Sequence, residues 1–351
     1  MKTEIIKLNK KNIELDKIRY AAQVLKDGGL VAFPTETVYG LGANALNQSA
    51  VERIFAAKGR PSDNPLIVHI ADAEALSELV GNIPPEAALL IDKLWPGPLT
   101  LVMNKSSKVP EIITAGLDTV AVRMPSHPIA LALIKESGLP VAAPSANTSG
   151  KPSPTSAEHV IEDLKGKVDV IIDGDTSDVG VESTVLDITE NPPVILRPGG
   201  VTPEQIGQLL GAVNMDPALL KQDLEHQVPK SPGMKYTHYS PKAEVVIVEG
   251  RLEKVVAKIN KLTQEYLAKG ISVGVLTTEQ AKDMYLSSEI ISMGDRNCPD
   301  TIAANLFNSL REFDRIGVQV ILAEAIDNKG IGLAVMNRMN KAAGYNIIKV
   351  D

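Results

Sequence analysis

The spacing of apolar residues near the start of the chain predicts a helix. Ile18, Ala21, Ala22 and Leu25 lie three or four positions apart, as on one face of a helix over about residues 15–26. The Gly28-Gly29 pair that follows is a stop signal. The chain therefore opens with an amphipathic helix.

Short apolar runs bounded by proline, glycine or polar residues alternate with helical patterns up to about residue 210. The first run, at 30–33, leads into Pro34. Further strands are predicted at 66–70, 99–103, 119–123, 141–143, 168–173, 183–188 and 194–197, and helices at 50–57, 86–94 and 129–136. We therefore expect a mixed α/β domain over residues 1–210.

The segment 211–241 has no regular apolar pattern beyond a short helical piece. Its proline-rich end predicts a linker, yet it carries two tyrosines, a histidine and two lysines that a plain spacer would rarely need. We expect residues 231–241 to fold over a reaction site as a lid that excludes water. Truncation before Gly211 should then impair turnover.

Strands and helices alternate again from residue 242 to the end. Strands are predicted at 245–248, 271–276, 290–293 and 318–323, and helices at 252–268, 278–285, 301–316 and 332–343. This alternation predicts a small Rossmann-like domain with a parallel sheet, over residues 242–351. It has no G-x-G-x-x-G after its first strand, so we do not expect a dinucleotide site there.

Composition narrows the functional classes. A length of 351 residues suits two domains, and the net charge of -7 argues against a protein that coats nucleic acid with its whole surface, although a local basic cleft and a weak tRNA contact stay open. The single Cys298 excludes an internal disulfide and a cysteine-cluster zinc site. The polar N-terminus and the absence of an apolar run of about 18 residues predict a cytoplasmic protein without a membrane span.

Four segments carry candidate chemistry, although P-loop, kinase, H-E-x-x-H and G-x-S-x-G motifs are absent. In the first, Thr35 and Thr37 follow a strand end and present hydroxyls either to a ligand or to an ordinary turn. In the second, Lys58 and Arg60 would point the same way in extended chain and converge on one anion, unless they form a solvated basic turn.

The third segment is the apolar strand 119–123, which ends in Arg123. Alternation places Thr119 and Arg123 on one face, where a buried arginine needs an anionic partner, either a ligand carboxylate or a structural ion pair. His69 poses the same choice between ligand binding and a core histidine. In the fourth segment, Ser145 and Asn147 share a face of an extended, small-residue loop after a buried strand.

Taken together, the motifs resemble the Sua5/YrdC/YwlC family. They are FPTETVYGLGANA, KGRPSDNPL, WPGPLT, TVAVRMP, APSANTSGKPSPT, GVEST and LRPGG, in this order, while SPGMKYTHYSP and MNRMNKAAGYN are similar to the two-domain Sua5 type. The resemblance implies a YrdC-like twisted mixed sheet with helices, followed by a smaller Rossmann-like domain. It also implies a nucleotidyltransferase that makes threonylcarbamoyl-AMP from L-threonine, bicarbonate and ATP. This is the first step of N6-threonylcarbamoyladenosine formation in tRNAs reading ANN codons.

The resemblance also implies site residues. Threonine would be bound by Thr37, His69, Arg123, the backbone of Ala143 and Ser183. ATP would be bound by Lys58, Arg60, Asn64, Thr119, Ser145, Asn147, Ser153, Arg197 and His238. Lys58 and Arg60 would act as the catalytic cations. No protein metal site is expected, so Mg²⁺ would arrive on ATP, and the product would pass to the tRNA threonylcarbamoyl transferase.

The expected chemistry needs no covalent nucleophile. The α-amine of threonine, whose pKa in water is about 7.7–8.0, takes up CO2 or bicarbonate, and the carbamate attacks the α-phosphate as pyrophosphate leaves. Two rival functions stay open. An RNA-binding translation-associated module would lack turnover, and a related hydrogenase-maturation enzyme would need cysteine-rich zinc fingers that one cysteine cannot supply.

Overall fold

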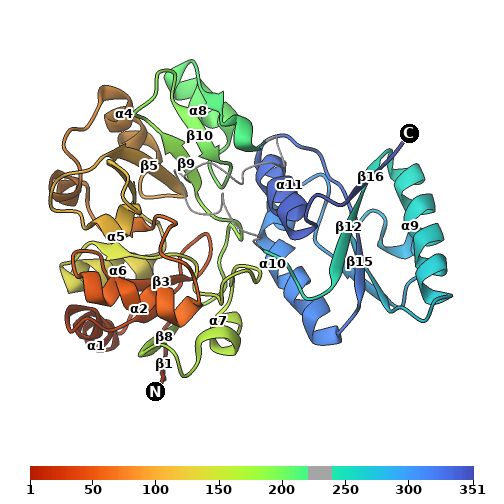
Figure 1. The fold of residues 1–351 in the computed structure, drawn as a ribbon, viewed down its shortest axis with the longest axis horizontal. Helices are drawn as coiled ribbons and strands as arrows, with labels where there is room; N and C mark the ends of the chain where they lie inside the picture. Colours follow the sequence, from red (N-terminus) through yellow and green to blue (C-terminus); the bar gives the residue numbers. More distant parts are fainter. Residues whose placement is uncertain (220–238) are drawn as a thin grey trace. The chain divides into compact units, whose positions relative to one another are not determined.

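The computed structural model describes residues 1–219 and 239–351, which group into two compact units (Figure 1). Within the described residues, unit 1 comprises 1–149 and 153–219, and unit 2 comprises 150–152 and 239–351. Each unit is built around its own sheet.

Unit 1 is built on a mixed sheet whose described strands run in the order β1-β8-β2-β3-β7-β4-β6-β5-β9-β10-β11. The sheet contains parallel pairs, such as β4 with β6, and antiparallel pairs, such as β5 with β6. The bounds are β1 Glu4–Lys7, β2 Val31–Phe33, β3 Gly40–Asn44, β4 Ile67–His69, β5 Leu99–Asn104, β6 Thr119–Arg123, β7 Val141–Ala142, β8 Val170–Asp173, β9 Thr184–Asp187, β10 Val194–Arg197 and β11 Asn214–Met215.

Helices cover this sheet on both faces. Their bounds are α1 Leu15–Lys26, α2 Gln48–Lys58, α3 Leu76–Leu79, α4 Pro85–Leu94, α5 Glu111–Thr114, α6 Pro128–Ser137, α7 Ala157–Leu164 and α8 Pro203–Leu210, with 3-10 turns η1 Ala73–Ala75 and η2 Pro217–Leu219. The α1 helix has the bounds that the apolar spacing predicts. The other three predicted helices of this region are found with ends shifted by at most two residues.

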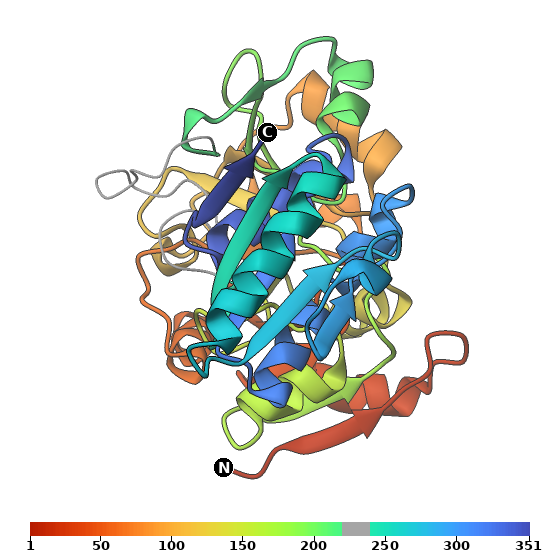
Figure 2. The ribbon, with the colours of Figure 1, turned by 90° about the vertical axis from the view of Figure 1, so that its right-hand side faces the viewer.

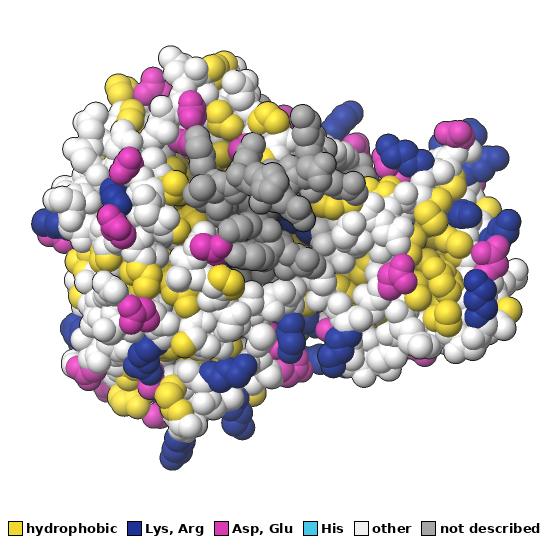
Figure 3. All heavy atoms as spheres, in the orientation of Figure 1, with side chains coloured by type: hydrophobic (Ala, Val, Ile, Leu, Met, Phe, Trp, Pro, Cys, Tyr) yellow, Lys and Arg dark blue, Asp and Glu magenta, His cyan; other side chains and the backbone are white. Residues whose placement is uncertain are grey.

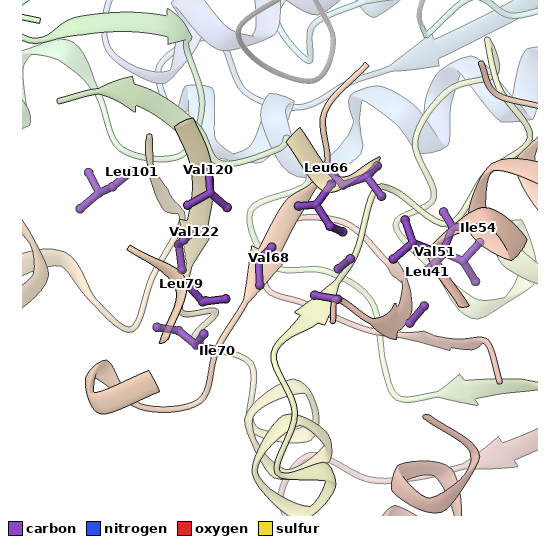
Figure 4. Packing of buried hydrophobic residues seen from close by; sticks show 14 of the residues in the cluster. Leu41, Val51, Ile54, Leu66, Val68, Ile70, Leu79, Leu101, Val120 and Val122 are labelled. Carbon is purple, nitrogen blue, oxygen red and sulfur yellow. The ribbon is translucent and has the colours of Figure 1, made fainter. Parts of the chain in front are cut away.

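The core of unit 1 has two layers, one on each face of the sheet, because successive side chains of a strand point to opposite faces. On β2, Ala32 joins a large cluster with α2 and α4, whereas Val31 and Phe33 join a second cluster with α1 and α6. Figure 4 shows side chains of the large cluster contributed by β3, α2, β4, β5 and β6. On β6, Val120 and Val122 also point into the large cluster, which leaves Thr119, Ala121 and Arg123 on the other face, as predicted.

The β3 strand was not predicted, because its sequence GLGAN reads as a turn. A Cβ atom at Gly42 would lie 2.8 Å from Phe33 Cε1 and 2.9 Å from Val141 Cγ1. Glycine is therefore needed for close packing within a strand here, rather than for a turn. The first strand, β1, was also missed, because it is an edge strand with a mostly exposed sequence.

Unit 2 carries a parallel sheet in the order β14-β13-β15-β12-β16. Its elements are β12 Glu244–Gly250, α9 Leu252–Leu267, β13 Val273–Thr277, η3 Lys282–Met284, β14 Glu289–Ser292, α10 Pro299–Ile316, β15 Val320–Glu324, α11 Ile331–Ala342 and β16 Ile347–Val350. Figure 2 shows α9 running alongside β12. The predicted Rossmann-like alternation is thereby confirmed, and β16 is an additional strand.

The predicted helix at 278–285 is wrong. Its residues instead form a turn with the short 3-10 piece η3, because three polar groups are drawn to neighbouring elements. The Thr278 hydroxyl donates to Glu324 Oε2 at 2.9 Å, and Tyr285 Oη donates to Glu324 Oε1 at 2.6 Å. The Glu279 N–H donates to the Gly294 carbonyl at 2.9 Å instead of closing a helical turn. Across the described part of the chain, no helix has both the length and the hydropathy needed to cross a membrane.

Candidate active site

Arg123 is the last residue of β6 and lies among the residues that are predicted to bind threonine. Its neighbours across the sheet are His69 of β4 and Thr100 of β5, and its side chain is only 3% exposed. Arg123 Nη1 donates to Thr37 Oγ1 at 2.8 Å, and Nε donates to the Gly97 carbonyl at 3.2 Å. The sheet thus aims one buried cation at the loop that follows β2.

The loop after β2 is shaped by its own hydroxyl groups. Thr35 Oγ1 lies 2.8 Å from Thr37 Oγ1 and accepts the N–H of Thr37 at 3.2 Å. The Ser177 hydroxyl donates to the Thr35 carbonyl at 2.9 Å. The hydroxyl groups therefore form the ordinary turn considered from the sequence, and Thr37 also accepts from Arg123, while the contact of these hydroxyls with a ligand stays a prediction.

His69 is buried beside Arg123, with its ring edge-to-face against Phe33 at 6.5 Å between centroids. Burial and the positive charge of Arg123 lower the pKa of His69 from its ordinary 6.5 to about 3. The ring is therefore neutral at physiological pH. Its Nδ1 atom makes no hydrogen bond within the described residues, so a ligand could use it.

Ser183 and Arg197 adjoin the same region through β5. Ser183 Oγ lies 2.8 Å from Thr100 Oγ1. Arg197 Nη2 donates to the Ser183 hydroxyl at 3.1 Å and to the Ser183 carbonyl at 3.0 Å. Ser183, which is predicted to bind threonine, thus contacts Arg197, which is predicted to bind ATP. Thr100 is also the cross-strand neighbour of Arg123.

Lys58, Ser145 and Asn147 form a second group. Lys58 Nζ donates to the carbonyls of Ser145 and Asn147 at 2.5 and 2.7 Å, and Ser145 Oγ donates to Asn147 Oδ1 at 2.6 Å. The shared face predicted for Ser145 and Asn147 agrees with this contact. The extended conformation expected around Lys58 is wrong: Lys58 is the last residue of α2, which ends because Gly59 takes a left-handed conformation.

Arg60 follows Gly59, whose left-handed conformation breaks the extended chain that was expected to align Lys58 and Arg60. Its Nη2 donates to the carbonyls of Asn64 and Pro65 at 3.4 and 3.3 Å. The Asn64 side-chain amide is fully buried and has no hydrogen-bond partner within residues 1–219 and 239–351. Polar atoms left in this way point to a ligand or water at this position.

The remaining predicted residues are spread around these groups. Thr119 starts β6, on the same face as Arg123, and is partly buried. The Ala143 N–H donates to the Ile67 carbonyl at 2.9 Å, and Ser153 Oγ donates to Glu182 Oε1 at 2.6 Å. His238 lies outside the described residues, as does most of the predicted lid.

Two buried carboxylates were missed by the sequence reasoning. Glu36 lies between the two threonines of the β2 loop and approaches Arg123 Nη2 at 2.7 Å, and Glu182 accepts the Ser153 hydroxyl. Both residues are 6% exposed as a whole. Both could have been noticed in the sequence, because each is an acidic residue inside a motif that was selected for its hydroxyl groups. Within the described chain, no three His, Cys, Asp or Glu side chains are grouped as a metal site.

Comparison with known families covers nearly the whole chain. Residues 23–199 match the Sua5/YciO/YrdC family model described as telomere recombination, and residues 201–344 match the threonylcarbamoyl-AMP synthase C-terminal domain. The chain is 56% identical to the threonylcarbamoyl-AMP synthase of Pyrococcus abyssi, over 97% of this chain and 98% of that protein. It is 53% identical to the Bacillus subtilis enzyme of the same name, over 95% and 94%.

Solved structures give the same picture. P. abyssi Sua5 complexed with L-threonine matches with a TM-score of 0.94 and 55% identity, over 99% of both chains. Escherichia coli YciO matches with a TM-score of 0.51 and 26% identity, over 56% of this chain and 96% of that one. The similarity to Sua5 thus spans both units, whereas the similarity to YciO covers little more than half of the chain.

Proposed function

The chain belongs to the Sua5 family of threonylcarbamoyl-AMP synthases, and we propose that it converts L-threonine, bicarbonate and ATP into threonylcarbamoyl-AMP and pyrophosphate. The observation that carries the proposal is the buried Arg123, which donates to Thr37 and has Thr100 as its cross-strand neighbour. Thr100 Oγ1 lies 2.8 Å from Ser183 Oγ, which accepts from Arg197. This set of neighbouring residues offers a carboxylate partner, hydroxyl groups and a second cation. The enzyme is a nucleotidyltransferase.

Threonine is bound at the Arg123 end of this set. The guanidinium pairs with the α-carboxylate, and arginine suits this role because its planar fork matches a carboxylate. Thr37 and Ser183 offer hydroxyl groups, His69 offers a neutral ring, and Ala143 contributes its backbone. A neutral His69 adds a hydrogen bond without repelling the positive charge on the substrate.

ATP is bound by the residues that surround this end. Arg197, Arg60 and Lys58 neutralise phosphate charge, and the hydroxyl and amide groups of Thr119, Ser145, Asn147, Ser153 and Asn64 bind polar atoms of the nucleotide, with His238 as a further contact. Mg²⁺ arrives with the ATP polyphosphate as part of the substrate. The donor set supports this division, because cations and hydroxyls suit phosphate oxygens, and acidic clusters suit protein-held metals.

The reaction proceeds by orientation and charge neutralisation. Bicarbonate takes up a proton and loses water to give CO2. The free α-amine of threonine attacks the carbon of CO2 and loses a proton, which gives a carbamate. A carbamate oxygen then attacks the α-phosphorus, and the bond to pyrophosphate breaks. The cations lower the barrier by holding both substrates in line and by stabilising charge on the phosphate oxygens.

The product is a mixed anhydride that water hydrolyses, so its use requires a nearby acceptor. We propose that it passes to the tRNA threonylcarbamoyl transferase, in the cytoplasm where ATP and tRNA are found, with at most a weak contact to tRNA. Figure 3 supports the weak contact, since basic and acidic side chains are interspersed over the described residues of the face that it shows. A protein whose main task is RNA binding would carry a basic surface.

The proposed function is tested by incubating the protein with ATP, labelled bicarbonate and each amino acid in turn. We expect pyrophosphate and a labelled adenylate with threonine, and little of either with the other amino acids. Tight RNA binding without pyrophosphate release would contradict the proposal.

A further inference from the structure

Glu36 is a buried carboxylate at the proposed threonine site that the assigned residues leave without a role. It approaches Arg123 Nη2 at 2.7 Å, and its own side chain is 8% exposed. The approach lacks hydrogen-bond alignment: within the described chain, neither Glu36 oxygen nor Arg123 Nη2 has a hydrogen-bond partner. Glu36 and Arg123 therefore form an ion pair in which the Glu36 oxygens and Arg123 Nη2 keep their hydrogen-bonding capacity.

The backbone fixes Glu36 in this place. The Val179 N–H donates to the Glu36 carbonyl at 2.7 Å, and the next residue, Thr37, accepts from Arg123 Nη1 at 2.8 Å. Two consecutive residues thus meet two different nitrogens of one guanidinium. Glu182, the other buried carboxylate of the site, is engaged by the Ser153 hydroxyl.

Arg123 has donors to spare. A guanidinium carries five N–H groups, of which one at Nε is used by Gly97 and one at Nη1 by Thr37. The groups that remain can receive an α-carboxylate while Glu36 stays beside them. An α-amino acid carries its carboxylate and its ammonium on the same carbon atom, so a carboxylate on Arg123 places the ammonium within a few ångströms of Glu36.

The residues assigned to threonine are a cation, hydroxyls, a neutral imidazole and a backbone group, and none of them is negatively charged. An ammonium group taken out of water without an anionic partner is costly. From this geometry we propose that Glu36 binds the α-ammonium group of threonine, so that Glu36 and Arg123 together recognise the amino-acid zwitterion. The inference rests on the proposed function, because it requires threonine to be the substrate.

The test compares two ligands in two proteins. L-Threonine and 3-hydroxybutyrate, which keeps the carboxylate and hydroxyl but has no amine, are titrated into wild type and into Glu36→Gln by calorimetry without ATP. In Glu36→Gln, we expect threonine affinity to fall about 10- to 100-fold, as for loss of a charge-assisted hydrogen bond, with the affinity for 3-hydroxybutyrate unchanged. Glu78→Gln, at an exposed ion pair with Lys108, serves as the control and should leave both affinities unchanged.

An equal loss for both ligands would show that Glu36 only positions Arg123, and an unchanged threonine affinity would show that it has no role in binding; either result overturns the inference. If 3-hydroxybutyrate binds too weakly to measure, the threonine affinity of Glu36→Asp is measured instead. Threonine affinity that recovers at least partly with the shorter carboxylate supports charge pairing, and a loss as large as in Glu36→Gln overturns it. Failure of the proposed function would give a different result from failure of this inference, because wild type would then bind no threonine.

Discussion

Arg123 shows how much of the site depends on one residue. Its partners Glu36 and Thr37 come from the loop after β2, and Gly97 comes from the loop before β5. The β6 strand fixes the position of Arg123 among them. A buried cation of this kind requires its partners, because an unpaired charge is costly to bury. The same requirement supports the proposed pairing of Arg123 with the carboxylate of threonine.

At this scale we predict the effect of Arg123→Lys. Lysine keeps the charge but loses the planar fork, so about 1.5–3 kcal/mol of charge-assisted bonding is lost. The KM for threonine should rise about 10- to 100-fold while the KM for ATP changes little, measured by pyrophosphate release. The control is Arg53→Lys, at an ion pair with Asp169 outside the site. A change in the ATP KM alone would contradict the assignment.

His69 allows a prediction about pH. Its pKa is about 3 in the folded protein, against an ordinary value of 6.5, so between these pH values the unfolded chain binds the extra proton. Its contribution to folding stability is therefore present above about pH 6.5 and is lost as the pH falls, at up to about 1.4 kcal/mol per pH unit. His69→Gln should show a shallower loss between pH 6 and 4 in urea unfolding. Parallel curves for the two proteins would contradict this account.

At the scale of elements, the contact between the loop after β10 and the start of β9 positions Ser183 and Arg197. A Cβ atom at Gly199 would lie 2.3 Å from the Glu182 carbonyl oxygen and 2.3 Å from the Thr184 nitrogen. Glycine is needed here for close approach of two backbones. Gly199 of LRPGG thus allows the backbone after β10 to lie against the start of β9.

We predict that Gly199→Ala destabilises unit 1 by about 1–3 kcal/mol, because the backbone must move to admit the methyl group. It should also impair turnover, since Ser183 and Arg197 are displaced. Gly207→Ala in α8 is the matched control: nothing lies within 4 Å of the added carbon, so about 0.5–1 kcal/mol of stabilisation is expected. Chemical unfolding and pyrophosphate release measure both effects. Equal stability of the two variants would refute the packing argument.

At the scale of the molecule, each unit has its own hydrophobic core. Unit 2 also contains a buried carboxylate, Glu324, which is fully buried and accepts from Thr278, Tyr285 and Arg296. Arg296 provides the compensating charge at 2.7 Å. The stability of unit 2 therefore depends on a polar network as well as on apolar packing.

The unfolding of unit 1 can be followed separately from that of unit 2, because the single tryptophan, Trp95, is buried in the core of unit 1. Glu324→Gln should cost unit 2 about 2–4 kcal/mol, since it removes the charge that pairs with Arg296. The unfolding transition seen by circular dichroism should shift, with little change in the Trp95 fluorescence transition. Glu279→Gln, at an exposed pair with Lys282, should shift neither. A shift of the Trp95 transition equal to that seen by circular dichroism would contradict separate cores.

The sequence by itself determined the elements whose periodicity is strong and the family to which the chain belongs. α1 and β6 have their predicted bounds, since local apolar spacing decides which face each residue presents. The ordered motifs indicated the family because each is weak alone, whereas the whole set in this order is highly specific. The domain boundaries and the individual ligand contacts stay predictions.

Only the tertiary structure decided what depends on partners distant in the chain. The glycine-rich β3 is a strand because neighbouring strands pack against Gly42, and the segment 278–285 is not a helix because Glu324 binds its polar groups. Lys58 and Arg60 are not joined by extended chain because Gly59 ends α2 between them. The importance of Glu36 became visible only from its position beside Arg123, because electrostatic interactions depend on distance in space and not on distance along the chain.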